Sequence, residues 1–210
     1  MFKDRCDAGK KLASLLSKYR NASNTIVLAL PRGGVPIAYE IAKELVLPLN
    51  ICLVRKLGVP SYPELAMGAI ALSDTIFLDK TLIKQFNLTM QDVQKVIDQE
   101  IKELIKRDKL YRNNKPYPVL EAKEVIIIDD GFATGATALA AISYIKKHGA
   151  QKIIFAVPVG PSDIEAILEP YVDEIACLCK LTDFYAVGQA YQDFSQVLDE
   201  EVLSLLRMSD

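Results

Sequence analysis

Residues 125–138 read V-I-I-I-D-D-G-F-A-T-G-A-T-A, and this stretch organises the rest of the chain. Its first four residues, 125–128, are apolar without polar alternation, which is typical of a strand buried on both faces. Two carboxylates, Asp129 and Asp130, follow directly, and residues 136–145 then show helical periodicity. The stretch therefore predicts a strand, an acidic corner, a short loop and the start of a helix.

The loop after the two acids is suited to bind an anion. Backbone N–H groups and the helix dipole at such a corner favour a phosphate, and glycines let the backbone approach it closely. No lysine follows Gly135, so this is not a Walker A loop. The alternative is a plain strand–turn–helix corner with a capping aspartate, which leaves two adjacent acids without a ligand at some cost. The predicted phosphate loop comprises Gly131, Phe132, Ala133, Thr134, Gly135, Ala136 and Thr137.

The acid pair indicates the class of ligand. Two carboxylates would repel a bare polyphosphate, but they suit a ligand that carries hydroxyls beside a phosphate, such as a ribose 5-phosphate. Carboxylates accept hydrogen bonds from a cis-diol, and one can also help to hold Mg²⁺. We therefore predict that Asp129 and Asp130 bind a ribose and are the candidate Mg²⁺ ligands.

Composition sets the class of protein. The chain has 210 residues, of which 50% are hydrophobic and 25% charged, and it suits a single domain over residues 1–210. A formal net charge of −2 offers no basic surface for nucleic acid. The absence of a long apolar run or of a signal-peptide core predicts a cytoplasmic protein that does not enter a membrane. Four cysteines and one histidine, without C-x-x-C spacing, predict no metal framework.

The rest of the chain alternates strands and helices, which predicts an α/β fold with a doubly wound parallel sheet. The strands are expected at residues 25–30, 50–55, 125–128, 152–157 and 174–178, with a break at 158–161 and a hairpin of 69–72 with 75–78. The helices are expected at residues 4–19, 35–46, 91–112, 136–145, 162–168 and 198–208.

Cations follow two of the expected strands. Pro31-Arg32-Gly33-Gly34 breaks the first strand, and Arg32 offers a fixed cation with bidentate geometry for phosphate oxygens. The alternative is a surface arginine on a glycine turn. The second strand ends in Arg55 and Lys56, at the carboxyl edge where open α/β sheets bind ligands.

The motif I-I-I-D-D-G-F-A-T-G-A-T resembles the phosphoribosyl-pyrophosphate (PRPP) motif of the type I phosphoribosyltransferases. Together with P-R-G-G, R-K-L-G-x-P-x-x-P-E-L-A-x-G-A and F-Y-A-V-G-Q, it resembles a less characterised bacterial branch of that family over nearly the whole chain. The resemblance implies a small hood, a flexible loop and Mg²⁺. It also implies that Asp129 and Asp130 hold the ribose hydroxyls while residues 131–137 wrap the 5-phosphate. Pyrophosphate would be contacted by the first loop, whose peptide is often cis, through Arg32, Gly33, Gly34, Arg55 and Lys56.

Two departures from the family pattern refine this expectation. Residues 57–68, at the position of the flexible loop, contain several prolines and glycines and are expected to form a lid. They carry no basic residue, so Arg55 and Lys56 are expected to contribute more to closure. Ala133 stands where some purine enzymes have an acid, which argues against a hypoxanthine or guanine acceptor. Tyr111-Arg112 recurs in the related branch and is assigned a site or interface role.

The acceptor must be read by another segment, and the resemblance points to a hood at residues 181–194. This segment has neither helical nor strand periodicity, and Phe184 and Tyr185 could stack on a flat heterocycle beside Val187. The alternative is that these aromatic residues fill the core or a dimer interface. The segment offers no charged pair for a carboxylated acceptor, so a neutral base is favoured.

The resulting hypothesis is a PRPP-dependent phosphoribosyltransferase, expected as a homodimer, with Asp129, Asp130 and Arg32 as its catalytic residues. A rival hypothesis is a non-catalytic PRPP- or nucleotide-sensing module with the same fold. A third, an α/β nucleotide binder or phosphatase with Asp129 as nucleophile, fits poorly with a phosphate loop directly after the acids.

Overall fold

The computed structural model describes residues 1–71, 75–113, 115–133 and 135–209. The chain divides into two compact units, and each is made of segments that are distant in sequence. The first unit comprises Met1–Cys52, Pro118–Ala133 and His148–Asp210, and the second comprises Leu53–Tyr117 and Thr134–Lys147. That residues 1–210 form a single domain stays a prediction.

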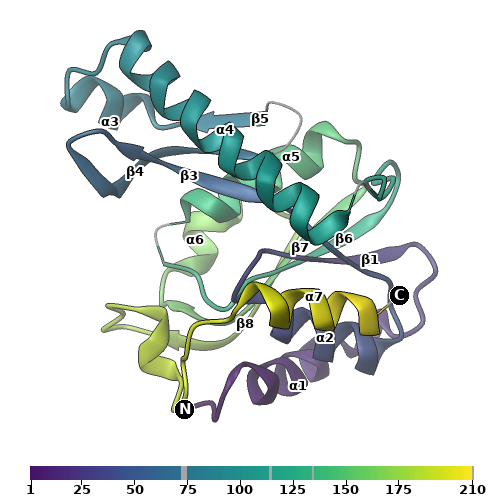
Figure 1. Ribbon diagram of the computed structural model, residues 1–210. Coiled ribbons are helices and arrows are strands. Elements are labelled where there is room, and N and C mark those ends of the chain that lie inside the picture. Colours follow the sequence, from purple (N-terminus) through teal and green to yellow (C-terminus); the bar gives the residue numbers. More distant parts are fainter. Residues whose placement is uncertain (72–74, 114, 134, 210) are drawn as a thin grey trace. The chain divides into compact units, whose positions relative to one another are not determined.

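A five-stranded sheet forms the centre of the first unit (Figure 1), and all of its pairings are parallel. The apolar run before the acid pair is buried within it, since Val125, Ile126, Ile127 and Ile128 are fully covered. The predicted parallel sheet is confirmed. Its order is β2-β1-β6-β7-β8, with β1 at Thr25–Ala29, β2 at Leu49–Ile51, β6 at Glu124–Ile128, β7 at Lys152–Pro161 and β8 at Glu174–Leu181.

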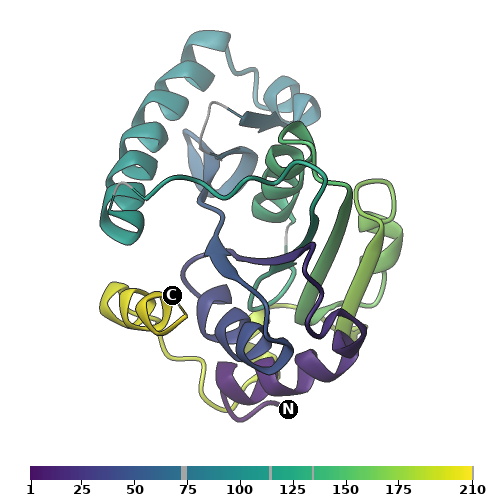
Figure 2. The same ribbon diagram turned by 90° about the vertical axis from the view of Figure 1, so that its right-hand side faces the viewer.

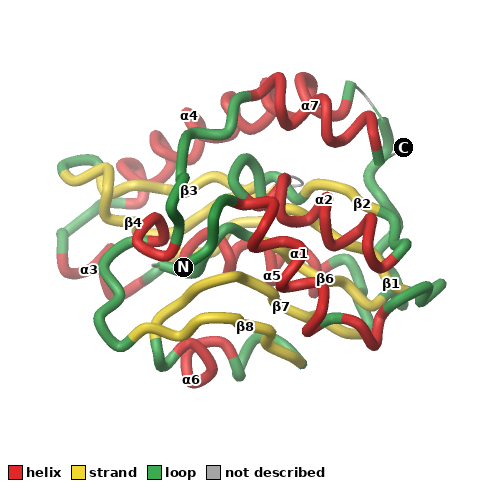
Figure 3. Tube along the Cα trace, turned by 90° about the horizontal axis from the view of Figure 1, so that it is seen from below, coloured by secondary structure: helices red, strands yellow, loops and turns green. Residues whose placement is uncertain are grey.

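Helices cover both faces of this sheet. The helices α1 (Arg5–Leu15) and α2 (Gly34–Leu45) pack against each other on one face, and α6 (Ile164–Leu168) lies on the other (Figure 3). The C-terminal helix α7 (Asp199–Met208) packs against α2. Short 3-10 turns at Ser17–Tyr19 and Val187–Ala190 complete the unit.

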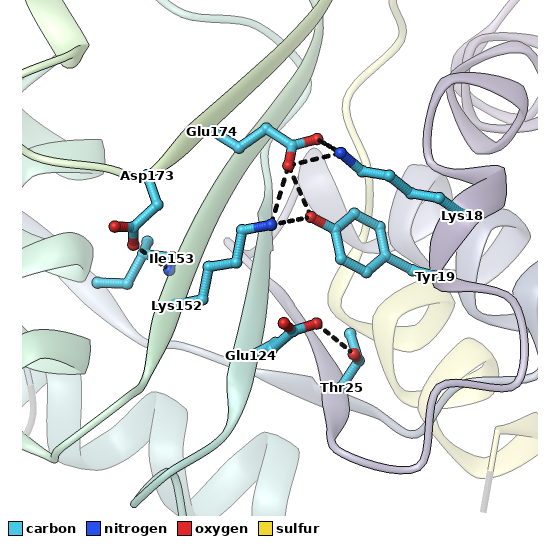
Figure 4. Close-up of polar contacts among 8 residues, drawn as sticks. All are labelled: Lys18, Tyr19, Thr25, Glu124, Lys152, Ile153, Asp173 and Glu174. Carbon is cyan, nitrogen blue, oxygen red and sulfur yellow. Dashed lines mark hydrogen bonds and ion pairs between the residues drawn. The ribbon is translucent and has the colours of Figure 1, made fainter.

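The amino edge of the sheet is closed by a polar cluster (Figure 4). Glu174 accepts hydrogen bonds from Lys18 Nζ at 2.8 Å, Tyr19 Oη at 2.7 Å and Lys152 Nζ at 3.2 Å. The hydrogen bonds of Lys152 with Tyr19 and then with Glu174 raise the pKa of its ammonium group. Because Lys152 and Glu174 are the first residues of β7 and β8, the cluster ties the Ser17–Tyr19 turn to this edge.

The second unit contains a three-stranded antiparallel sheet between two helices (Figure 2). The apolar stripe predicted for the long helix packs on β3 and β4 through Val93 and Ile97. A capping box of Thr89 and Asp92 starts that helix. Of the helices described, none is long and apolar enough to cross a membrane. The elements are β3 at Val54–Val59, β4 at Tyr62–Ala71, β5 at Thr75–Leu78, α3 at Lys80–Gln85, α4 at Met90–Arg112 and α5 at Ala136–Lys147.

Residues 50–68 differ from the expected structure in two respects. The strand expected at residues 50–55 is split, because β2 ends at Ile51 and β3 begins at Val54 in the other sheet. Residues 57–68, expected to be irregular, are largely a β-hairpin of β3 and β4, and their role as a lid stays a prediction. Its glycines and prolines are accommodated because the strand register shifts on both sides of Gly58.

The strand break expected at residues 158–161 is also wrong, because β7 continues to Pro161. The last β6 residue, Ile128, pairs with Ala156, so Pro158 lies where β7 is paired only with β8. Proline has no N–H group, and at this position its absence removes no hydrogen bond to β6. The hairpin of β4 with β5 is confirmed, although residues 72–74 of its turn lie outside the described residues.

Candidate functional site

The carboxyl ends of β1 and β6 meet at the point where the strand order reverses. From β1 the sheet continues to β2 on one side, whereas β6, β7 and β8 follow on the other. Open α/β sheets bind ligands in the crevice at such a switch point. Ala29 pairs with Ile128, and the Leu30 N–H donates to the Ile128 carbonyl at 2.8 Å. The two predicted motifs therefore start side by side.

The glycine turn after β1 packs directly on the acid pair. The peptide bond between Pro31 and Arg32 is cis, as the family resemblance implied. A Cβ added to Gly33 would lie 1.9 Å from Asp130 Oδ2, and one added to Gly34 would lie 2.5 Å from the Ile128 carbonyl oxygen. Only glycine permits this approach, so the structure brings the turn and the acids together.

The two acids differ in their electrostatic surroundings. The Asp130 N–H donates to Asp129 Oδ1 at 2.9 Å. Burial, followed by the charge of Asp130, raises the pKa of Asp129 well above its ordinary value. Burial also raises the pKa of Asp130, but the charge of Arg5 opposes that increase. Arg5 thus favours the ionised form of Asp130, and an ionised carboxylate accepts hydrogen bonds from a cis-diol.

Arg5 and Tyr191 complete the acid corner, and sequence reasoning assigned neither of them a role. Arg5 donates to Asp130 Oδ2 through Nε at 3.1 Å and Nη2 at 2.9 Å, and to the Ser195 carbonyl through Nη1 at 2.7 Å. The Tyr191 hydroxyl donates to the Asp130 carbonyl at 2.7 Å. Desolvation raises the pKa of Tyr191, so its hydroxyl remains a donor.

Residues 2–5 and 190–195 form a strap beside the corner. The Phe2 N–H donates to the Ala190 carbonyl, and the Gln192 N–H donates to the Phe2 carbonyl, both at 2.8 Å. The ring centroids of Phe2 and Tyr191 lie 5.4 Å apart. In Figure 1 the N-terminus accordingly lies beside the segment that precedes α7. The strap is what carries Arg5 and Tyr191 to Asp130.

Arg32, the predicted pyrophosphate cation, faces an acid of α7. Its Nη1 lies 3.4 Å from Asp199 Oδ1, and its side chain is 26% exposed. Asp199 also belongs to the acidic first turn of α7, where negative charge stabilises the helix dipole. Asp199 is another neighbour of the site that the sequence did not reveal.

The predicted phosphate loop is divided between the two units, and Thr134 lies outside the described residues. Phe132 has a structural role, because its N–H donates to the Val159 carbonyl at 2.9 Å and its ring packs on Phe155. Gly135 has a left-handed φ of 76°, and α5 begins at the next residue. The helix start predicted after the loop is confirmed.

The two remaining predicted pyrophosphate cations, Arg55 and Lys56, lie on β3 in the second unit. The expectation that they end a parallel strand is wrong, because β3 pairs antiparallel with β4. Arg55 Nε donates to Glu100 at 2.6 Å, so an acid of α4 already engages this cation. Their contact with pyrophosphate stays a prediction.

Tyr111 and Arg112 are both buried at the end of α4. The Arg112 guanidinium lies 3.8 Å from the Tyr117 ring centroid, donates to the Lys115 carbonyl at 3.2 Å and pairs with Asp108. These contacts fasten the segment after α4 to the helix. They explain the burial of Arg112 by packing within its own unit.

The residues predicted to read the acceptor have three different environments. Phe184 packs against the core cluster that contains Phe2 and Tyr191, whereas Tyr185 is 87% exposed. Val187 touches the acid corner, since a Cβ on Gly131 would lie 2.5 Å from its Cγ1. The segment therefore reaches the corner through Val187.

Within the described residues, no group of three His, Cys, Asp or Glu side chains is placed to hold a metal ion. Mg²⁺, however, usually takes one or two carboxylates together with waters and substrate oxygens. In the described part of the chain, no group donates a hydrogen bond to Asp129 Oδ2 or Asp130 Oδ1. These two carboxylate oxygens could therefore serve as ligands of a substrate-bound Mg²⁺.

Comparison with known proteins identifies relatives of the whole chain. The phosphoribosyl transferase domain family matches residues 2–194. A Mycobacterium tuberculosis protein provisionally named as a phosphoribosyl transferase is 43% identical over 206 residues, covering 98% of this chain and 46% of that protein. The chain thus spans about half the length of the curated relatives it matches. A uracil phosphoribosyltransferase of Staphylococcus saprophyticus is 37% identical over 71 residues, 32% of this chain and 34% of its own.

Among solved structures, the crystal structure of a Thermus thermophilus protein superposes with a TM-score of 0.82 at 35% identity. The match covers 98% of this chain and 97% of that one. An Aquifex aeolicus protein gives a TM-score of 0.50 at 12% identity, over 85% of this chain and 77% of its own, which indicates a shared fold alone.

Proposed function

Because the chain belongs to the phosphoribosyl transferase domain family, we propose that it transfers ribose 5-phosphate from PRPP to a nitrogenous base with release of pyrophosphate. The observation that carries this proposal is the acid pair at the end of β6, packed against the cis-peptide turn after β1. Two carboxylates that can accept hydrogen bonds from hydroxyls, and the cation Arg32, are thereby brought to one edge of a parallel sheet. This combination suits a phosphorylated sugar.

In the proposed reaction, a ring nitrogen of the base forms a bond to C1 of the ribose while the bond from C1 to the pyrophosphate oxygen breaks. The nitrogen loses its proton to water, and pyrophosphate leaves with the electrons of the broken bond. Asp129 and Asp130 hold the ribose hydroxyls and thus fix the sugar ring. No nucleophile from the protein is required.

Negative charge grows on pyrophosphate as the sugar acquires oxocarbenium character. Arg32 would stabilise that charge, because a cation aimed at a developing anion lowers the barrier. Mg²⁺, which Asp129 and Asp130 would hold, supplies further charge neutralisation when bound with PRPP. In the second unit, Arg55 and Lys56 are the additional candidates for pyrophosphate.

The proposal is tested by incubating the protein with PRPP, Mg²⁺ and a panel of neutral bases, and by measuring pyrophosphate release. Release that requires a base supports a transferase. PRPP binding by calorimetry without release from any base would instead indicate the non-catalytic sensing module. Sedimentation of the same preparation tests the expected homodimer.

Arg32→Ala is expected to weaken the binding of pyrophosphate and PRPP but to spare ribose 5-phosphate. The loss should be about tenfold to a hundredfold, the scale of a charge-assisted hydrogen bond. Calorimetry with the three ligands separates the roles. Equal losses for all three would show that Arg32 does not serve pyrophosphate selectively.

Asp199→Asn is expected to have the opposite effect on pyrophosphate binding, because it removes the carboxylate that faces Arg32 at 3.4 Å. Pyrophosphate should bind a few-fold more tightly, in keeping with the small energy of a partly exposed ion pair. Unchanged pyrophosphate binding together with a full loss in Arg32→Ala would mean that Asp199 does not compete for the cation.

Phe184→Leu and Tyr185→Leu test the acceptor assignment. If the segment reads the base, acceptor affinity should fall while PRPP affinity holds, with a loss of ~1–3 kcal/mol for each stacking ring removed. Because Tyr185 is exposed and Phe184 packs against a core cluster, Tyr185→Leu is the cleaner variant. Lower thermal stability with intact acceptor affinity would instead assign these rings to packing.

A further inference from the structure

Two donors of one guanidinium converge on a single oxygen of Asp130. Arg5 Nε and Nη2 both bond to Oδ2, and the side chains of Arg5 and Asp130 are 11% and 18% exposed. Rotation of the carboxylate would break both bonds, so its orientation is fixed. Within the described residues, Oδ1 accepts no hydrogen bond and remains available to a ligand.

The guanidinium is itself held from its other side by the strap. Its third N–H group donates to the Ser195 carbonyl at 2.7 Å, and its Cζ lies 4.0 Å from the Phe194 ring centroid. A planar fork that stacks and donates in three directions is a property of arginine, which lysine does not share. The Tyr191 hydroxyl meanwhile holds the backbone carbonyl of Asp130. Both the backbone and the side chain of Asp130 are therefore fixed by the same strap.

We infer that Arg5 is a positioning residue that fixes the Asp130 carboxylate and presents its Oδ1 to the ribose hydroxyls of PRPP. The inference rests on the function proposed above. Arg5 acts through Asp130 and supplies no contact to the reacting atoms. It differs from Arg32, which would contact the leaving group.

The test compares Arg5→Gln and Arg5→Lys with Lys152→Gln, which removes a comparable cation from Glu174 at the opposite edge of the sheet (Figure 4). PRPP affinity, measured by calorimetry, should fall about tenfold to a hundredfold in both Arg5 variants. Ribose 5-phosphate affinity should fall in parallel, whereas pyrophosphate affinity should hold, because Arg5 acts through the acid that faces the ribose. Lys152→Gln should change none of these affinities.

The crystal structure of the ligand-free Arg5→Gln variant separates this inference from the proposed function. If the wild-type protein does not bind PRPP, the proposed function fails, but an Asp130 carboxylate that has rotated in Arg5→Gln still supports the positioning role. A folded Arg5→Gln variant with wild-type PRPP affinity and an unrotated Asp130 carboxylate overturns the inference. If Arg5→Gln does not fold, Arg5→Lys decides, because unchanged PRPP affinity there contradicts the inference.

Discussion

Replacement of Asp129 and Asp130 together by asparagine is expected to weaken PRPP binding by at least ~1–3 kcal/mol, the scale of lost charged hydrogen bonds. Both residues lie at the end of β6, and in the proposed complex they accept hydrogen bonds from the ribose hydroxyls. Asparagine keeps the size of the side chain but exchanges one acceptor oxygen for a donor. Calorimetric titration with PRPP and Mg²⁺ measures the effect.

The matched control is Glu124→Gln, at the opposite end of the same strand, where the acid accepts a hydrogen bond from Thr25 at 3.2 Å. It should leave PRPP affinity unchanged. Unaltered affinity in the double variant would remove the basis for assigning the ribose to this corner.

The single variant Asp129→Asn should bind PRPP poorly without losing stability. Burial and Asp130 raise the pKa of Asp129 above its ordinary value of 3.8, so the folded protein binds a proton that the unfolded chain releases. Folding stability should therefore fall as pH rises through the window between 3.8 and the raised pKa. Asparagine removes that loss, and denaturation at neutral pH should show equal or greater stability than the wild-type protein.

Gly33→Ala is the second change with a large expected effect. The new methyl group would lie 1.9 Å from Asp130 Oδ2 and 2.5 Å from its Cγ, and Arg5 prevents the carboxylate from turning away. Overpacking of this kind costs about 1–3 kcal/mol of unfolding free energy. PRPP affinity should fall as well, because whichever group moves belongs to the proposed site. Denaturant unfolding and calorimetry measure the two effects.

A double-mutant cycle shows whether the clash with Asp130 is the cause. In an Asp130→Ala background, the two closest atoms are gone and the nearest remaining contact is the Cβ at 3.2 Å. The stability cost of Gly33→Ala should then be clearly smaller, because residues in contact do not contribute additively. An equal cost in both backgrounds would place its origin in the turn itself.

The parallel sheet was predictable because its strands are short, apolar and followed by punctuating residues. The run at residues 125–128 carries that signal, and two acids mark where it ends. The β4–β5 hairpin of the second sheet was predicted, but β3 was assigned to the parallel sheet because only Cys52 and Leu53 separate it from β2. Hydrophobic pattern alone does not show that the chain leaves one sheet for another between such near neighbours.

The site was predictable where its residues follow strand ends in sequence, as in Arg32, Asp129 and Asp130. Arg5 was not, because it stands 125 residues before the carboxylate that it holds. It resembles any polar residue at a helix start, and Tyr191 resembles any aromatic residue in an irregular segment. Such contacts are set by tertiary packing, and no periodicity or motif spacing in the local sequence indicates them.

The strap also bears on the order in which the ribosome makes the protein. Arg5 emerges first, Asp130 follows 125 residues later, and Ser195 appears 190 residues after Arg5. All five strands of the parallel sheet are synthesised before the second half of the strap. A nascent chain can therefore assemble its sheet while Asp130 still lacks Tyr191 and the backing of Arg5. The contacts that hold Asp130 are therefore completed only once residues 190–195 have been made.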